Sequence, residues 1–247
     1  MLITSVDNKK IKDYVLLKTS KGRKEKGLFL VEGSHLCEEA EKSGLLQELL
    51  VLDKIKLEFD TNKEITYVSK NVMKKISNLT NIPMVIGVCK IKEKKKIVGN
   101  HLLLLDNIQD PGNIGTIIRS AKAFDVDTIV LSDDSVDIYN DKVLRSTQGM
   151  LFHSNIVYDN LTNVINNLKK ENYVILGTDV NNGTDVRDIK VDKYALIMGN
   201  EGHGVRKEIK EICDKNLYIK MNNSCESLNV AVATSILLYE LNRSNHE

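Results

Sequence analysis

The chain has 247 residues, of which 42% are hydrophobic and 28% charged, with 35 basic and 34 acidic side chains and a formal net charge of +1. This composition excludes wholesale disorder, and the length fits one large or two modest domains. The four cysteines are scattered without a C-x-x-C pair, which argues against a disulfide scaffold or a zinc site. Because no apolar run approaches a membrane span and the first residues lack a signal-peptide core, we expect a cytoplasmic protein without membrane contact.

The near-zero net charge is an average over two unequal parts. Residues 1–96 contain 20 Lys and Arg against 13 Asp and Glu, a balance of +7, whereas residues 97–247 contain 15 and 21, a balance of −6. Such asymmetry favours a polyanionic partner for the first part, although lysine-rich surfaces also occur without one.

The first 96 residues predict a small α/β domain. Helical spacing covers Asn8–Lys18, and a basic loop, Lys21–Gly27, follows it. Strands are expected at Leu28–Val31, Leu46–Leu52, Ile65–Val68 and Met84–Cys89, and helices at Ser34–Lys42, with Ser34 as the cap, and at Lys70–Asn78. The charged run Lys90–Lys96 indicates a linker within about 90–100, which places the domain boundary near residue 96.

From residue 97 short apolar runs alternate with helical patterns. Strands are expected at 102–105, 128–131, 173–177, 194–198 and 217–219, and helices at 114–124, 141–150, 161–170, 205–213 and 227–242. This alternation predicts a mostly parallel sheet covered by helices on both faces, which binds ligands in the loops at the carboxyl ends of its strands.

Three of these loops carry polar residues suited to a ligand site. In the first, Pro111 and Gly112 predict a tight turn with positive φ at the glycine, and Asn113 then caps the next helix, although plain strand–turn–helix punctuation also explains this spacing. The second, Ile197–Val205, contains three glycines but is neither a dinucleotide fingerprint nor a phosphate loop. The third leads into a helix that is apolar on nearly every face. Their candidate side chains are Asn113, Arg119, Glu201, Ser227 and Asn229. Together the three loops predict a small-molecule pocket, whereas His203 and Cys225 lack a partner at catalytic spacing and are left out of it.

The segments Asn107–Phe124, Ile197–Gly204 and Glu226–Ala233 resemble, in order and separation, the three motifs of the SpoU (TrmH-like) RNA ribose 2′-O-methyltransferases. Residues 3–36 resemble the amino-terminal RNA-binding domain of many members, of the ribosomal protein L30e-like type, and Arg145–His153 resembles a further family segment. The resemblance implies a trefoil-knotted, SPOUT-type α/β catalytic domain with a parallel sheet over 97–247, preceded by an L30e-like domain over 1–96. It also implies S-adenosylmethionine as cofactor and a homodimer, and we expect no metal.

The resemblance also assigns residues of this chain to roles. The implied catalytic residues are Asn113, Arg119, Glu201, Ser227 and Asn229. The implied cofactor-binding residues are Thr178, Gly199, Asn200, Glu201, Gly202, Gly204, Ile219, Met221 and Leu228. Lys220 departs from the family pattern, in which proline is common, and this puts the rigidity of its loop in question.

Basic residues of the first domain, together with Arg145, are expected to contact RNA phosphates. They are Lys9, Lys10, Lys12, Lys21, Arg23, Lys24, Lys26 and Arg145. Because an arginine stays protonated in proteins, Arg119 is expected to hold a phosphate and stabilise the developing oxyanion rather than to act as the base.

The predicted function is S-adenosylmethionine-dependent 2′-O-methylation of a ribose in structured RNA, with 23S ribosomal RNA as the first expectation. Transfer RNA is the main competing substrate, and an antibiotic-resistance role within ribosomal RNA stays open. The alternative from another class is a non-catalytic RNA-binding or ribosome-assembly protein on the same scaffold, against which the five retained polar residues argue. A dehydrogenase is disfavoured because the Rossmann fingerprint is missing.

Overall fold

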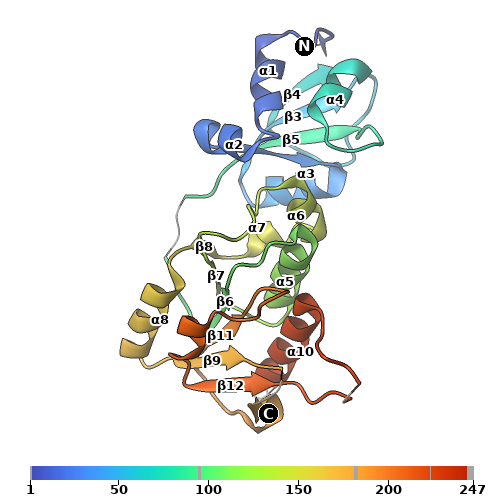
Figure 1. The fold of residues 1–247 in the computed structure, drawn as a ribbon. Helices are drawn as coiled ribbons and strands as arrows, with labels where there is room; N and C mark the ends of the chain where they lie inside the picture. The colour runs from blue at the N-terminus through green and yellow to red at the C-terminus, as the bar shows by residue number, and fades with distance from the viewer. Residues whose placement is uncertain (1, 94–95, 181–182, 223, 244–247) are drawn as a thin grey trace. The chain divides into compact units, whose positions relative to one another are not determined.

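The structure, a computed structural model, describes residues 2–93, 96–180, 183–222 and 224–243. The chain divides into two compact units (Figure 1). The first comprises Met1–Glu93 and Asp137–His153, and the second comprises Lys94–Val136 and Ser154–Glu247. The two units are described in turn.

The first unit is built on a mixed five-stranded sheet with the order β1-β4-β3-β5-β2. Its strands are β1 (Leu2–Ile3), β2 (Leu28–Glu32), β3 (Leu46–Leu52), β4 (Glu64–Val68) and β5 (Val85–Lys90). Strand β4 is parallel to β1 and β3, whereas β5 is antiparallel to β2 and β3. Four of these strands lie within a residue or two of their predicted positions, and the two-residue β1 was not predicted.

Helices cover both faces of this sheet. One hydrophobic cluster joins Ile11 of α1 (Lys9–Leu16) and Met73 of α4 (Lys70–Ile76) to Ile86 of β5. The next residue along β5, Gly87, instead lies beside Cys37 of α3 (Ser34–Lys42). Because successive strand residues point to opposite faces, α3 covers the face opposite to α1 and α4. Ser34 is the first residue of α3 rather than its cap, which is Gly33 with φ of 97°.

The expected basic loop at Lys21–Gly27 is wrong, because this segment forms a helix, α2 (Ser20–Lys26). The Thr19 hydroxyl caps its start by accepting a hydrogen bond from the Gly22 amide at 3.0 Å, and Gly27 ends it with φ of 64°. A Cβ at Gly22 would lie 2.1 Å from the Leu16 carbonyl oxygen. The glycine therefore permits close packing of α2 against the end of α1, which the sequence pattern alone presents as a loop signal.

The segment Asp137–His153, predicted as part of the second domain, packs with the first unit. It contains α6 (Asp141–Ser146) and α7 (Met150–His153), which replace the single helix expected over 141–150. The Phe29 ring lies 4.5 Å from the Tyr139 ring and 6.4 Å from the Phe152 ring, measured between centroids. The segment joins the first unit because its aromatic rings cover a phenylalanine of β2 that is fully buried.

The second unit confirms the predicted parallel sheet. Its seven strands have the order β10-β12-β9-β11-β6-β7-β8, and every neighbouring pair is parallel. The strands are β6 (His101–Leu105), β7 (Thr128–Leu131), β8 (Ile156–Tyr158), β9 (Val174–Thr178), β10 (Thr184–Asp185), β11 (Tyr194–Met198) and β12 (Lys215–Tyr218). The central strands β6, β7 and β11 are buried almost throughout, as expected for a sheet covered on both faces, and the short β8 and β10 were not predicted.

Helices flank this sheet on two sides (Figure 1). They are α5 (Pro111–Ala123), α8 (Leu161–Lys170), α9 (Lys207–Lys210) and α10 (Val230–Arg243), with a 3-10 turn at Val186–Asp188. Ile165 of α8 belongs to the same hydrophobic cluster as Leu102 and Leu104 of β6, whereas α5 and α10 pack against each other. No helix in the described ranges is long and apolar enough to cross a membrane.

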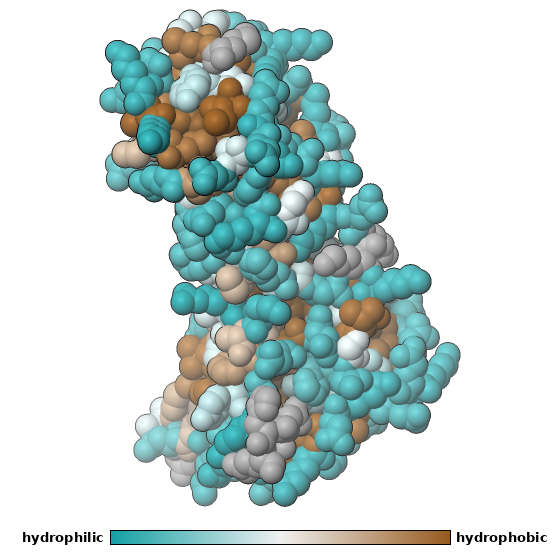
Figure 2. All heavy atoms as spheres, turned by 180° about the vertical axis from the view of Figure 1, so that it is seen from behind, coloured by the Kyte–Doolittle hydropathy of each residue, from teal (hydrophilic) through white to brown (hydrophobic). Residues whose placement is uncertain are grey.

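The surface of the first unit is not uniformly polar. Figure 2 shows hydrophobic atoms among hydrophilic ones on one face of this unit. The large hydrophobic side chains that it exposes include Leu2, Tyr67 and Met84, with 48%, 37% and 59% of their areas accessible. The lysine-rich composition therefore does not describe every face of the unit.

Candidate active site

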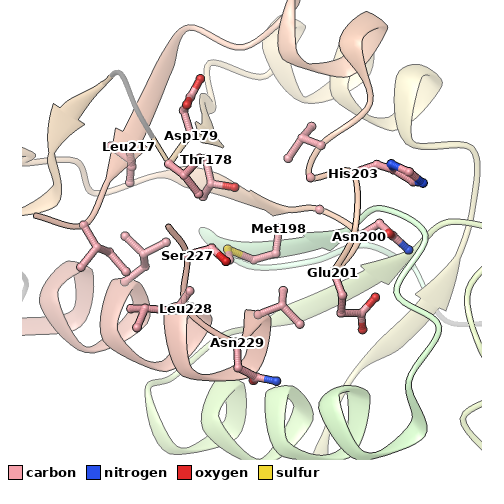
Figure 3. Close-up of a pocket in the computed structure, with 18 of the residues that line it drawn as sticks. Thr178, Asp179, Met198, Asn200, Glu201, His203, Leu217, Ser227, Leu228 and Asn229 are labelled. Carbon is pink, nitrogen blue, oxygen red and sulfur yellow. The ribbon is translucent and has the colours of Figure 1, made fainter. Parts of the chain in front are cut away.

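The carboxyl ends of four adjacent parallel strands, β12, β9, β11 and β6, meet at one edge of the sheet. The loops that follow β9, β11 and β12 surround a cavity of about 530 Å³ (Figure 3). Its wall contains apolar side chains, among them Met198, Leu217 and Leu228, and polar side chains such as Thr178 and Asn229. The cavity therefore lies where the sequence predicted the ligand loops, and its volume is that of an ordinary small-molecule pocket.

All nine expected cofactor-binding residues line this cavity, in three separate stretches of the chain. They are Thr178, Gly199, Asn200, Glu201, Gly202, Gly204, Ile219, Met221 and Leu228. Lys220, which replaces the proline common in the family, is exposed and is absent from the lining between Ile219 and Met221. The substitution therefore changes the outer side of this loop rather than the cavity wall.

The glycine loop after β11 is closed on itself. The Asn200 and Gly204 amides each donate to the other residue's carbonyl oxygen, at 3.0 and 2.9 Å. Gly204 has φ of 70°, and a Cβ at Gly199 would lie 2.1 Å from the Gly204 carbonyl carbon. The close approach at Gly199 and the left-handed backbone at Gly204 therefore favour glycine, and the hairpin-like loop presents backbone at the cavity wall.

Asn113 does not cap α5, which begins earlier than predicted. The Asp110 carboxylate caps the helix by accepting a hydrogen bond from the Asn113 amide at 2.8 Å, and Pro111 is the first helical residue, so the expected tight turn at Pro111–Gly112 is wrong. Proline suits this position because its fixed φ matches the helix and no N–H is lost. The Asn113 side chain is thereby left for contacts outside the helix.

The Asn113 carboxamide bridges the other two motif loops. Its Nδ2 donates to Glu201 Oε1 at 3.0 Å, and its Oδ1 accepts from Asn229 Nδ2 at 3.0 Å. The Asn229 Oδ1 in turn accepts from the Ala231 amide at 2.9 Å at the start of α10. Figure 3 shows Glu201 and Asn229 near one end of the cavity and Thr178 and Asp179 near the other. Three of the five expected catalytic residues thus form one chain of hydrogen bonds.

The other two expected catalytic residues lie apart from this chain. Ser227 lines the cavity. Arg119 is an exposed residue of α5, and its side chain makes no hydrogen bond or ion pair within the described residues. At about 100° per residue, six positions place Arg119 roughly 120° around the helix from Asn113, so the two side chains leave α5 in different directions.

The cavity also contains residues that the sequence did not single out. Asp179 and Lys210 both line it and form an ion pair, and His203, set aside above, lines it as well. Asp179 directly follows β9, which ends at Thr178 and was predicted over 173–177, and this position could have marked it. Lys210 lies on a four-residue helix with no comparable signal. In the described parts of the chain, no three His, Cys, Asp or Glu side chains are grouped as a metal site.

The basic residues expected to contact RNA differ in availability, and Arg23 is a correction. Only 6% of Arg23 is exposed, because its guanidinium donates to Asp137 Oδ2 at 2.6 Å and to the Leu17 carbonyl oxygen at 3.0 Å. Because this guanidinium is buried and bonded inside the first unit, Arg23 is not a phosphate contact. Lys10 lies 2.5 Å from Glu48 and is half-buried.

The remaining candidates are accessible to different degrees. Lys12, Lys21, Lys26 and Arg145 are each within 4 Å of a carboxylate, in pairs with Asp7, Glu25, Asp13 and Asp141. Lys9 and Lys24 are exposed and form no ion pair with any described residue. These two lysines are the most available for an anionic partner.

Comparison with known proteins gives matches over nearly the whole chain. Residues 100–239 match the SpoU rRNA Methylase family, and residues 8–87 match the MRM3-like substrate binding domain. The chain is 40% identical over 243 residues to the 23S rRNA (guanosine(2553)-2′-O)-methyltransferase RlmP of Bacillus subtilis (strain 168), covering 97% of this chain and 98% of that protein.

Solved structures resemble it along the same length. The SpoU methyltransferase AviRb from Streptomyces viridochromogenes, in complex with AdoMet, has a TM-score of 0.86 at 25% identity and covers 97% of this chain and 99% of its own. An AdoMet-bound rRNA methyltransferase from Sinorhizobium meliloti has a TM-score of 0.87 at 27% identity, covering 98% and 97%. Both similarities span the two units.

Proposed function

This chain belongs to the SpoU rRNA Methylase family, and we propose that it transfers the methyl group of S-adenosylmethionine to the 2′-hydroxyl of a ribose in 23S ribosomal RNA. The observation that carries the proposal is that Asn113 joins Glu201 and Asn229, which both line the cavity, although Asn113 and Asn229 are 116 residues apart in the chain. Because the Bacillus relative is named for guanosine 2553, the equivalent nucleotide is the first acceptor to test.

The cavity suits this cofactor in size and chemistry. Its volume of about 530 Å³ lies within the range of pockets for ligands of this size. The apolar side chains of the wall would contact the less polar parts of the molecule, while backbone groups of Gly199–Gly204 and the Thr178 hydroxyl would meet its polar groups. When bound, S-adenosylmethionine supplies a methyl group activated by a sulfonium.

The residues of the chain would then hold two reactants in line, which supplies much of the acceleration of a displacement reaction. The hydrogen-bonded chain of Glu201, Asn113 and Asn229 fixes polar side chains at one end of the cavity, where we place the ribose. Arg119 acts as a cation that holds a neighbouring phosphate and stabilises charge on the 2′-oxygen. The hydroxyl proton leaves to a phosphate or to water.

The first unit would bind the RNA, with Lys9 and Lys24 as its leading phosphate contacts. Both side chains are exposed and unpaired among the described residues. Phosphate contacts give affinity that falls steeply with salt, while recognition of the site depends on the shape of the RNA and its single-stranded bases.

We place the protein in the cytoplasm as a homodimer with a trefoil knot in its second unit, as the family resemblance implies. One helix face supports the dimer. Helix α10 exposes Val232 and Tyr239, with 48% and 53% of their areas accessible, and the Tyr239 ring lies 5.8 Å from that of Phe124 after α5. Burial of this α5–α10 face against a second copy would remove its apolar surface from water. Light scattering of wild type and Val232→Asp tests this arrangement, which predicts a smaller species for the variant.

The decisive experiment is methylation of RNA with methyl-labelled S-adenosylmethionine. Separate 23S ribosomal RNA and transfer RNA fractions from cells lacking this activity would be incubated with the protein, and alkali-resistant linkages would then be mapped. We expect label on a ribose of 23S RNA at the nucleotide equivalent to guanosine 2553. Label confined to transfer RNA would contradict the substrate, and label on a base would contradict the reaction.

A further inference from the structure

The carboxylate of Asp106, the first residue after β6, is completely buried and is held by a single residue a hundred positions later in the chain. Its Oδ2 accepts from the Arg206 backbone amide at 2.9 Å, and its Oδ1 accepts from Arg206 Nε at 2.7 Å and lies 2.5 Å from Nη2. This bond with Asp106 also raises the pKa of the guanidinium above its ordinary value. A buried carboxylate with both oxygens committed to one arginine is expensive to expose or to leave unpaired.

Arg206 lies directly beyond the glycine loop that lines the cavity, and it does not line the cavity itself. The beginning of the same loop is tied to the same place, because Asn200 Nδ2 donates to the Asn107 carbonyl oxygen at 2.8 Å. Both ends of the Gly199–Val205 loop are therefore attached to the residues Asp106 and Asn107. Between these ends, Glu201 receives the Asn113 bond described above.

We propose that Arg206 and Asp106 are a positioning pair that holds the glycine loop in the shape required for cofactor binding and sets it in register with the start of α5. The inference rests on the proposed function, since it assigns the loop to the cofactor. Arg206 acts through the loop rather than by contact with the ligand. The pair holds the loop at its carboxyl-terminal end, so that Glu201 stays within hydrogen-bond distance of Asn113.

Cofactor affinity in the full-length protein without RNA tests the proposal. The dissociation constant of S-adenosylhomocysteine, measured by calorimetry, is expected to rise roughly 10- to 100-fold in Arg206→Met, because charge-assisted hydrogen bonds of this kind are lost. Arg206→Lys, which keeps the charge and the backbone bond, should recover part of the loss. The matched control is Lys207→Met, the neighbouring lysine, whose side chain is 89% exposed and does not reach Asp106. It should bind as the wild type does.

Amide hydrogen exchange separates positioning from general instability. In Arg206→Met the amides of the glycine loop should exchange faster, while those of β6 and β11 keep wild-type protection. The double variant Asp106→Asn, Arg206→Met has no buried carboxylate that lacks a cation. The melting temperature of this double variant should therefore exceed that of Arg206→Met alone. If exchange accelerates throughout the sheet, the pair is merely structural and the proposal is overturned.

The Arg206 side chain is 42% exposed, so the competing hypothesis is that it contacts an RNA phosphate. In that case Arg206→Met would weaken RNA binding and flatten its salt dependence while binding S-adenosylhomocysteine as the wild type does, and the proposal would be overturned. These results differ from failure of the proposed function, in which the wild-type protein itself would not bind S-adenosylhomocysteine.

Discussion

Replacing Arg23 by methionine should destabilise the first unit and leave the number of its phosphate contacts with RNA unchanged. The guanidinium, 7% exposed, is bonded to Asp137 Oδ2 and to two carbonyl oxygens, those of Leu17 and Lys18. Methionine fills similar volume but leaves the Asp137 carboxylate without its cation and both carbonyl groups without this donor.

The expected cost follows from these contacts. Removal of one partner from a buried ion pair costs about 3–5 kcal/mol. Since 27% of the Asp137 side chain is exposed, water can partly hydrate the orphaned carboxylate, and we expect the lower end, about 3 kcal/mol. The matched variant Lys24→Met removes an exposed charge one residue away, and its effect on stability should stay within about 0.5 kcal/mol.

Urea unfolding monitored by circular dichroism measures the first effect, and the salt dependence of RNA binding measures the second. In Lys24→Met the slope of log affinity against log salt should become shallower by roughly 0.7 to 0.9, the value for one phosphate contact, while in Arg23→Met it should equal that of the wild type. The reasoning is refuted if Arg23→Met unfolds at the wild-type urea concentration and has the shallower slope.

Three further predictions concern the second unit and the cysteines. Asn113→Ala loses both bridging hydrogen bonds and should lower kcat at least about 10-fold in steady-state assays. Its melting temperature should stay within about 2 °C of that of the wild type, because the bonded groups are exposed. Arg119→Lys should lower kcat/KM by roughly 100-fold without loss of stability, since the side chain has no bond within the described chain; near-normal turnover would exclude a role for the guanidinium fork. With iodoacetamide at pH 8, mass spectrometry should find Cys225, which is exposed, alkylated first, and Cys37 and Cys89 last, because burial raises the pKa of both thiols, that of Cys37 to about 12. Equal labelling of Cys225 and the two buried thiols in the folded protein would contradict their placement.

The sequence alone determined five of the seven strands of the second unit's sheet and, through the family resemblance, nine residues of the cavity wall. Continuous apolar runs such as Leu102–Leu105 can be satisfied only by strands covered on both faces, and parallel strands place their following loops at one edge. The motif residues of the loops after β11 and β12 consequently line one cavity, whereas Asn113 and Arg119 of the first motif lie outside its wall.

The sequence misled where one residue type serves two purposes. Glycine punctuates loops, but Gly22 lies inside a helix because the Leu16 carbonyl oxygen leaves no room for a side chain. Asparagine caps helices, but Asn113 does not, because Asp110 three residues earlier takes that role. Local patterns favour both readings equally, and the choice depends on neighbours outside the segment.

Only the tertiary structure decided which polar groups are partners. Arg23 and Asp137 are 114 residues apart, and Asp106 and Arg206 are 100 apart. A local sequence pattern predicts that a charged residue is exposed to solvent. Burial of such a residue becomes favourable only when a distant partner supplies the opposite charge and the hydrogen bonds. The sequence therefore determined where the cavity forms, whereas packing decided which charges remain at the surface and which hold the loops around that cavity in place.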